Sequence, residues 1–273
     1  MNESGSPPFQ SFLFVPGDRP ERYSKAVASG ADAVILDLED AVSPSSKQDA
    51  RHSVMSWVSP DHPVLVRINA PGTPWFAEDI KLGMLPGVAG LVLSKAESIN
   101  DIVTAAGGPT GQVAIYPLIE SAKGMWNVEE IASASNVRQL LFGTLDFIAD
   151  MGIAGDGEEL NTYRATLALV SRVYELNPPV DGVSTAIDDV DKLIRESSAG
   201  KRLGFGGKLC IHPKQVPIVN QCYRPSEAEL DWAKQVVDAS LHADEAVFVM
   251  NGKMIDRPVI LKAQRMLAEA RGR

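Results

Sequence analysis

Residues 115–120, IYPLIE, and residues 140–146, LLFGTLD, most strongly indicate how this chain folds. In each segment a short apolar run stops at a carboxylate, Glu120 in the first and Asp146 in the second. The two carboxylates lie about one strand–helix–strand repeat apart, so a parallel α/β fold would bring them to the same end of neighbouring strands. Carboxylates placed in this way can share one hard divalent cation, and we expect Glu120 and Asp146 to bind Mg²⁺. N-capping of the following helices is the alternative role for each.

Apolar runs of the same kind recur along the chain at the spacing of a β–α unit. The clearest are FLFV (12–15), AVILDL (33–38), VLVRI (64–68), VAGLVL (88–93), VAIYPLI (113–119) and LLF (140–142). They are rich in Val, Ile and Leu without strict alternation, as expected for parallel strands that are buried on both faces. Weaker runs at 180–183 and 208–211 complete the set, which predicts an α/β fold of the TIM (β/α)8 barrel type. No Gly-x-Gly-x-x-Gly turn follows the first run, which argues against a dinucleotide-binding sheet.

The sequence also indicates where the barrel begins and ends. Residues 1–10 are largely polar and contain Pro and Ser, which predicts a flexible N-terminal tail. We expect the barrel to occupy residues 11–222 and a C-terminal helical extension to occupy residues 223–273. One helix of this extension should begin at the Ser-x-x-Glu signature of Ser226 and Glu229. The extension is a candidate for packing on a neighbouring subunit.

The overall composition narrows the class of function. The net charge of −9 argues against nucleic-acid binding, which depends mainly on clustered Lys and Arg. No apolar run reaches the length of about 18 residues that a membrane-spanning helix needs. Cys210 and Cys222 are the only cysteines and form no Cys-x-x-Cys motif, which is typical of the reducing cytoplasm. We therefore expect a cytoplasmic protein that acts on a small molecule.

Further charged residues stand at the predicted strand ends, where the active site of such a barrel collects. Arg67 closes the run VLVRI, where a charge is costly without a partner. We expect Arg67 to contact a substrate carboxylate or an enolate, and a structural salt bridge to Glu39 or Asp40 is the alternative. We place Glu39 and Asp40 in the substrate site, where they would bind metal-bound waters or orient Arg67. Capping of the next helix is their alternative role.

Three other residues carry chemistry that the pattern alone does not assign. Lys95 could form a Schiff base, but a metal site would make that reaction superfluous. His212 could line the barrel mouth or be a hydrogen-bonded structural histidine. Asp256 directly precedes the last predicted helix, 258–270, so its spacing alone predicts only an N-cap.

Taken together, these segments resemble the citrate lyase β-subunit-like family of CoA-ester lyases, within the HpcH/HpaI aldolase/citrate lyase superfamily. The matching segments are LFVPGD (13–18), VILDLEDAV (34–42), VRIN (66–69), KAES (95–98), IES (119–121), CIHP (210–213) and GKMID (252–256). They extend over nearly the whole chain in a fixed order. Such an ordered set is far more specific than any one of its motifs.

The resemblance implies a site as well as a fold. Glu120 and Asp146 match the Mg²⁺ ligands of the family, and Arg67 matches its substrate-binding arginine. Asp256 matches an aspartate on a C-terminal segment that in relatives reaches the active site of a neighbouring subunit, usually in a homotrimer. Family members cleave or form a carbon–carbon bond in 3-hydroxy-acid thioesters of CoA or of an acyl carrier protein. We therefore predict a Mg²⁺-dependent lyase for a citryl-, malyl- or citramalyl-CoA type of substrate, with Asp256 as the catalytic proton-transfer group.

The chain departs from the family pattern at positions that concern the substrate. Leu145 stands directly before the second metal aspartate, where many relatives carry Glu, and Gln10 and Phe14 replace an Arg and a Tyr that are usual there. Arg22 and Lys25 are candidates for contacts to CoA phosphates, although a solvated helix face is the simpler interpretation of both. Two other functions stay open. One is an aldolase of the same barrel class that acts on a free acid, and the other is a non-catalytic subunit of a lyase complex.

Overall fold

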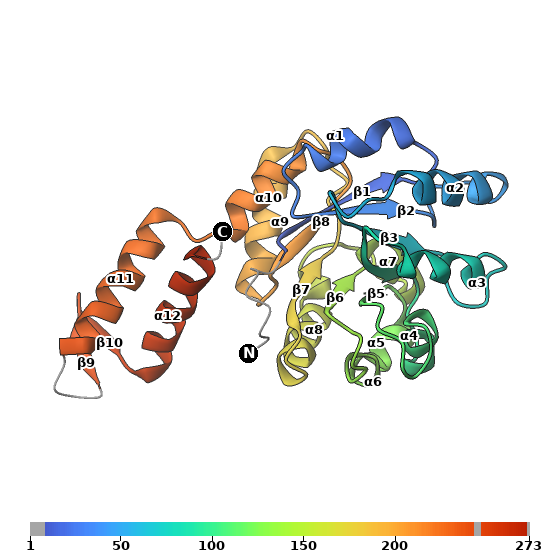
Figure 1. The fold of residues 1–273 in the computed structure, drawn as a ribbon. Coiled ribbons are helices and arrows are strands. Elements are labelled where there is room, and N and C mark those ends of the chain that lie inside the picture. Colours follow the sequence, from blue (N-terminus) through green and yellow to red (C-terminus); the bar gives the residue numbers. More distant parts are fainter. Residues whose placement is uncertain (1–8, 243–246, 272–273) are drawn as a thin grey trace. The chain divides into compact units, whose positions relative to one another are not determined.

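The computed structural model describes residues 9–242 and 247–271, which divide into two compact units, Phe9–Tyr223 and the residues from Arg224 onward. The N-terminal tail expected at residues 1–10 lies almost entirely outside the described ranges. The first unit contains a closed barrel of parallel strands and the second is mainly helical (Figure 1). The predicted TIM (β/α)8 barrel with a C-terminal helical extension is therefore confirmed. No helix in the described ranges is long and apolar enough to cross a membrane.

The barrel strands are hydrogen-bonded in sequence order, and β1 closes the ring against β8. The strands are β1 (Ser11–Pro16), β2 (Ala33–Asp37), β3 (Val64–Ile68), β4 (Val88–Leu93), β5 (Ile115–Ile119), β6 (Gln139–Phe142), β7 (Asn177–Asp181) and β8 (Gly207–Cys210). All of them run in the same direction, so their C-terminal ends meet at one mouth. The weaker runs predicted at 180–183 and 208–211 correspond to β7 and β8. β7 begins at Asn177, before the predicted start at 180, because Pro178 and Pro179 are poor strand signals in the sequence.

Helices cover the outside of the strands (Figure 1). The α-helices of this unit are α1 (Tyr23–Val27), α2 (Lys47–Trp57), α3 (Phe76–Asp79), α4 (Ile99–Ala105), α5 (Ala122–Trp126), α6 (Val128–Ala132), α7 (Thr144–Met151), α8 (Asn161–Val173), α9 (Val190–Arg202) and α10 (Gln215–Tyr223). Short 3-10 helices are η1 (Pro20–Arg22), η2 (Pro44–Ser46), η3 (Ile80–Met84) and η4 (Glu158–Leu160).

Two apolar layers hold the barrel together, because successive residues of a strand face opposite sides of the sheet. The interior of the barrel is filled by Phe12, Ala33, Ile35, Leu65, Val92, Tyr116, Leu118, Leu141, Val180 and Leu209. The outer layer, between strands and helices, takes the alternate residues, such as Leu13, Leu36 and Val66. The strands are thus buried on both faces, which explains why their sequences do not alternate between apolar and polar residues.

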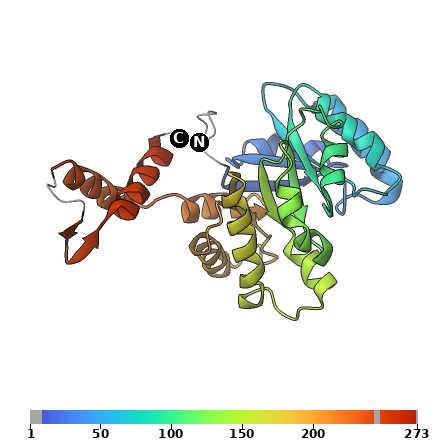
Figure 2. The same cartoon turned by 90° about the horizontal axis from the view of Figure 1, so that it is seen from below.

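The second unit packs two helices side by side and carries a two-stranded hairpin (Figure 2). Its elements are α11 (Glu227–His242), β9 (Phe248–Met250), β10 (Lys253–Ile255) and α12 (Arg257–Arg271). A small core joins them, formed by Ala233, Val236, Ile255 and Ala263.

Local sequence signals account for the ends of these elements. The Ser226 amide donates to Glu229 Oε2 at 2.8 Å and the Glu229 amide donates to Ser226 Oγ at 3.2 Å, so the predicted capping box at the start of α11 is confirmed. Asn251 and Gly252 have φ angles of 53° and 73°. Two positive φ angles in succession suit the tight turn of a two-residue hairpin loop.

Candidate active site

The C-terminal ends of the barrel strands enclose a cavity of about 400 Å³. The charged side chains that line it are Asp37, Asp40, Arg67, Glu120 and Asp146. They come from β2, the loop after β2, β3, the residue after β5, and α7. The barrel therefore gathers into one mouth residues that lie far apart in the sequence, and it does so at the end where barrels of this fold place their active sites.

Arg67 is held in this mouth by carboxylates. Its Nε and Nη2 donate to the two carboxylate oxygens of Asp37 at 2.7 and 2.6 Å, and its Nη1 lies 3.0 Å from Glu39 Oε2. The Phe14 ring lies 4.8 Å from the guanidinium carbon, a cation–π distance. Burial alone would lower the pKa of Arg67, but the charge and hydrogen bonds of Asp37 outweigh burial and raise it. Arg67 is therefore a permanent, fixed cation.

Glu39 and Asp40 differ in their surroundings. Glu39 is buried, and its Oε2 also accepts a hydrogen bond from the Asp40 amide at 3.0 Å. Burial raises the pKa of Glu39 to about 7, against the opposing charge of Arg67. Asp40 is exposed, lines the cavity and lies 3.9 Å from Arg67 Nη1. Neither caps the next α-helix, because α2 begins only at Lys47, so that alternative is wrong.

Glu120 is a deeply buried acid of the mouth, with 3% of its surface exposed. Its Oε1 accepts a hydrogen bond of 2.7 Å from the Lys95 amide. Burial raises the pKa of Glu120 to about 8, while Arg67 and the Lys95 amide oppose the shift and the charges of Glu39 and Asp146 add to it. Glu120 is not an N-cap, because the next residue, Ser121, caps α5, so that alternative is wrong.

Lys95 contributes its backbone to the mouth. It has a φ of 48°, in the left-handed region that residues other than glycine rarely adopt. In this conformation its amide is the donor to Glu120 Oε1. Its ammonium group lies 4.0 Å from Glu39 Oε1, and the side chain lines a neighbouring cavity.

Asp146 lies in the first turn of α7 and lines the same cavity as Glu120. The N-cap of α7 is Gly143, so Asp146 is not the capping residue. An acidic side chain in the first turn is nevertheless favoured by the helix dipole. The charge of Asp146 is one of the smaller contributions to the raised pKa of Glu120.

The donor set of this mouth fits a hard divalent cation. The described residues contain no group of three or more His, Cys, Asp or Glu side chains arranged to hold a metal, so Glu120 and Asp146 would have to bind it as a pair. Mg²⁺ commonly takes one or two carboxylates and leaves its other positions to water and substrate. A cation would also stabilise the ionised form of Glu120, which burial disfavours. Glu120 and Asp146 are therefore the residues that could hold Mg²⁺.

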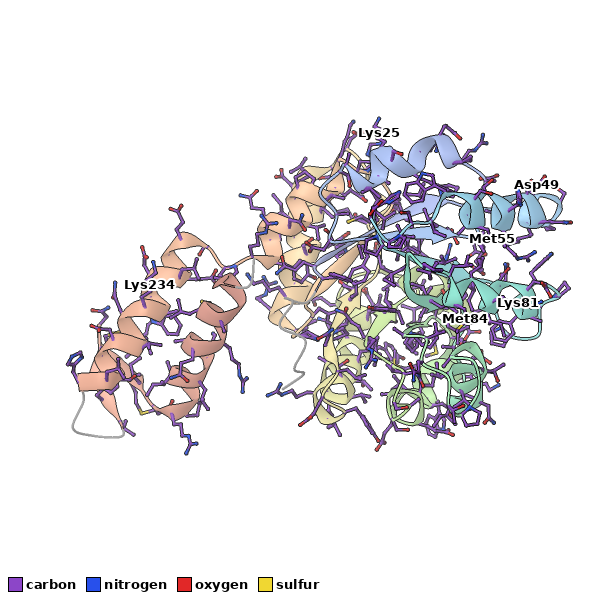
Figure 3. All side chains as sticks on the ribbon, in the orientation of Figure 1. Lys25, Asp49, Met55, Lys81, Met84 and Lys234 are labelled. Atoms are coloured by element: carbon purple, nitrogen blue, oxygen red, sulfur yellow. The ribbon has the colours of Figure 1, made fainter. Side chains whose placement is uncertain are left out.

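Arg22 and Lys25, the candidates for CoA contacts, lie outside this cavity. Both are exposed, and Arg22 lies 3.8 Å from the carboxylate of Glu21. Figure 3 shows Lys25 on the outer side of α1. Both follow β1 and therefore stand on the segment that leaves the mouth.

Asp256 and His212 make local hydrogen bonds. The Asp256 carboxylate accepts a hydrogen bond of 3.2 Å from the Val259 amide, so the N-cap predicted from spacing is confirmed. Asp256 lies in the second compact unit. His212 Nδ1 accepts a hydrogen bond of 3.1 Å from the Lys214 amide, and His212 does not line the cavity.

Two structural partners of the site were missed by sequence reasoning. Asp37, rather than Glu39 or Asp40, is the main partner of Arg67, and the two are opposite each other in the β2–β3 register. Asp37 and Arg67 stand near the ends of consecutive apolar runs in the sequence, and this is the feature from which their pairing could have been predicted. Gly143 is the second residue that sequence reasoning missed. A Cβ atom at this position would lie 2.6 Å from Glu120 Oε2. Only the packing of β5 against β6 makes this contact evident.

Comparisons with known proteins place this chain in a family. A model of the HpcH/HpaI aldolase/citrate lyase family matches residues 10–213, and one of the C–C bond lyases of the TIM-barrel fold matches residues 159–271. The chain belongs to the HpcH/HpaI aldolase/citrate lyase family. It is 35% identical over 266 residues to the citrate lyase subunit beta-like protein of Mycobacterium tuberculosis, covering 95% of this chain and 94% of the relative. The predicted family and the carbon–carbon lyase class are confirmed.

Two further relatives carry information on ligands. The chain is 32% identical over 272 residues to the (3S)-malyl-CoA thioesterase of Cereibacter sphaeroides, with 96% of this chain and 95% of the relative covered. The crystal structure of CitE from Mycobacterium tuberculosis in complex with magnesium, acetoacetate and coenzyme A superposes with a TM-score of 0.85 at 34% identity. That match covers 98% of each chain.

Replacing Gly143 with Ala should abolish Mg²⁺ binding without unfolding the barrel. The new methyl group would stand 2.6 Å from Glu120 Oε2 and 2.5 Å from its Cβ, so the carboxylate must move. Isothermal titration of MgCl₂ into wild type and variant measures the change, and the thermal melt in EDTA controls for folding. Unchanged Mg²⁺ affinity in a folded variant would contradict the placement of the ion at Glu120.

Replacing Arg67 with Met should destabilise the barrel, because Asp37 and Glu39 then lose the cation that lies closest to both. Removing one partner of a buried ion pair costs about 3–5 kcal/mol. When a carboxyl group has a higher pKa in the folded chain than in the unfolded chain, lowering the pH stabilises the folded chain. The pKa of Glu39 in the folded protein is about 7 with Arg67 present, so near pH 6 Glu39 is largely protonated and needs a cation less. The loss should therefore be largest near pH 8 and smaller near pH 6. Urea unfolding at both pH values measures it, and an equal loss at both would argue against this pairing.

Proposed function

We propose that the protein is a Mg²⁺-dependent lyase that cleaves or forms a carbon–carbon bond in a 3-hydroxy-acid thioester of CoA, of the citryl, malyl or citramalyl type. The observation that carries the proposal is the cavity that Glu120 and Asp146 share with Arg67. The magnesium, acetoacetate and coenzyme A in the Mycobacterium tuberculosis structure support it. So does the malyl-CoA thioester in the name of the Cereibacter sphaeroides relative.

Cleavage follows a retro-aldol or Claisen route. The 3-hydroxyl group loses its proton, and the bond between its carbon and the α-carbon of the thioester breaks. The electron pair of that bond passes to the thioester as an enolate, which takes up a proton to give the shorter acyl thioester, and the other half leaves as an oxo acid. When bound by Glu120 and Asp146, Mg²⁺ supplies a Lewis acid and a template for the oxygen atoms of the oxo-acid half.

Arg67 would stabilise the negative charge that develops during this reaction. A guanidinium has five N–H donors, and two of those of Arg67 bond to Asp37, so donors remain for a substrate oxygen. Because Asp37 and Glu39 already fix the group, little reorganisation is needed when the enolate forms. Asp40 lines the cavity and would bind waters near the ion.

Asp256 is the proposed proton-transfer group, and we place it in the active site of a neighbouring subunit of a homotrimer. It belongs to the second compact unit, whereas the described residues that line the cavity belong to the first. The hairpin beside it exposes an apolar cross-strand pair, Val249 at 74% and Met254 at 63%. Exposed apolar pairs of this kind are typical of surfaces that contact another chain.

The CoA part of the substrate would lie near the segment after β1. Arg22 and Lys25 are exposed there and would contact its phosphates. Cys210 and Cys222 are both free thiols, which suits the cytoplasmic location that we propose.

Asp146→Ala should abolish Mg²⁺-dependent cleavage of malyl-, citramalyl- or citryl-CoA while the barrel stays folded, because one of two metal ligands is lost. The assay follows thioester cleavage with Mg²⁺ or EDTA, and circular dichroism controls for folding. Wild-type activity that persists in EDTA would reject the metal role. Cleavage of the free hydroxy acids without CoA would favour the aldolase alternative, and no turnover of any substrate would favour a non-catalytic subunit.

Mixing Asp256→Ala with Glu120→Ala chains should restore part of the activity that each variant lacks alone. A mixed trimer can combine an intact Asp256 from one chain with an intact metal pair from its neighbour. Native mass spectrometry of differently tagged chains verifies that subunits have exchanged. Absence of recovery after verified exchange would place Asp256 in its own subunit's site or outside catalysis.

A further inference from the structure

We infer that the mouth selects a 2-oxo acid with a single carboxylate and an alkyl substituent over a 2-oxo acid with a second carboxylate. This inference rests on the proposed lyase function and names the substrate class of the same site. It follows from how charge and apolar surface are divided around the cavity.

The cavity has a charged side and an apolar side. Its acids and Arg67 come from the part of the barrel between β2 and α7. The next strands around the ring contribute Val183, after β7, and Leu209 and Ile211, within and after β8. Leu145, beside Asp146, adds apolar surface and is 47% exposed. A substituent that points away from the metal pair towards this side would meet hydrocarbon rather than hydrogen-bond donors.

Among the residues that the structure describes, one cationic side chain lines the cavity. Of the described residues that line it, only Arg67 is basic, and Asp37 and Glu39 already engage it. The lysines near the apolar side, Lys208 and Lys214, form ion pairs with acids that do not line the cavity. The buried Lys208 ammonium lies 3.8 Å from Asp181 and 3.5 Å from Glu196, and Lys214 lies 2.8 Å from Asp188. Neither lysine lines the cavity.

The balance of charge disfavours a second carboxylate. The lining contains the carboxylates of Asp37, Asp40, Glu120 and Asp146 against the single guanidinium of Arg67. A divalent cation held by Glu120 and Asp146 would offset only part of this excess, and the carboxylate and oxo oxygens of the oxo acid would already use that positive charge. A second carboxylate on the ligand would therefore lie beside the apolar side chains of Val183 and Ile211 with no cationic side chain of the lining to pair with, which disfavours it. An alkyl group at the same place has no charge that needs a partner, and it gains apolar contacts with the lining.

The test compares oxo acids of similar size in the condensation direction. Acetyl-CoA, Mg²⁺ and one of pyruvate, 2-oxobutyrate or oxaloacetate are incubated with the wild-type protein, and each thioester product is identified by mass. Mass identification separates true oxaloacetate products from those of pyruvate formed by its decarboxylation. We expect kcat/KM for pyruvate and 2-oxobutyrate to exceed that for oxaloacetate at least roughly 10-fold, the scale on which one apolar contact discriminates.

Calorimetric titration of the same acids in the presence of Mg²⁺ separates the two levels of the proposal. If oxaloacetate binds as tightly and reacts as fast as pyruvate, the proposed selectivity is wrong, but the proposed lyase function is not affected. Neither binding nor product from any oxo acid would overturn the lyase function, and the selectivity with it.

A positive charge placed on the apolar side should weaken or remove the preference for the oxo acid with a single carboxylate. Ile211 is 40% exposed, so Ile211→Arg should fold, and it would supply the cation that a second carboxylate lacks. The ratio of kcat/KM for oxaloacetate to that for pyruvate should rise roughly 10-fold, whereas the matched Ile211→Met variant should leave the ratio near the wild-type value. Leu145→Lys repeats the test from the other rim if Ile211→Arg melts early. An unchanged ratio in a folded charged variant would overturn the inference.

Discussion

The ion pair between Arg67 and Asp37 is the interaction on which the mouth of this barrel depends. Several carboxylates meet there, and a cluster of buried acids is tolerable only when cations offset their charge. Arg67 does so through two hydrogen bonds to Asp37 and a close contact to Glu39. The same bonds hold the guanidinium in place, so one group both stabilises the fold and offers a fixed positive charge to a ligand.

Glu120 shows how the scaffold prepares a place for a second cation. It is buried, and its pKa is raised to about 8, so the protein alone only partly stabilises its charge. The Lys95 amide holds one of its oxygens, and the absence of a side chain at Gly143 leaves room for the carboxylate between β5 and β6. Asp146 adds a second carboxylate from the first turn of α7. Backbone positions thus prepare the site as much as the acids do.

The mouth separates two tasks around the ring of strands. The part from β2 to α7 carries the groups that handle charge, and the part from β7 to β8 presents Val183, Leu209 and Ile211. A closed barrel permits this division because each strand end contributes to the cavity independently of the others. The proposed chemistry belongs to the first part and the proposed choice of oxo acid to the second. The second compact unit, with Asp256, would add its proton-transfer group from another chain.

Sequence alone determined the barrel, because buried parallel strands leave long apolar runs at regular spacing. It placed Glu120 and Arg67 at strand ends, whereas Asp146, predicted at the end of the sixth strand, lies in the first turn of the following helix α7. It also predicted the capping box at Ser226 and the N-cap at Asp256, since these signals are local. The pairing of Arg67 with Asp37 was decided by the tertiary structure, because strand register chooses among several nearby acids. Tertiary packing likewise decided that Gly143 and the Lys95 amide contact Glu120, and that no other cation lines the described cavity. Such contacts join residues distant in sequence, and no local pattern encodes the distance between them.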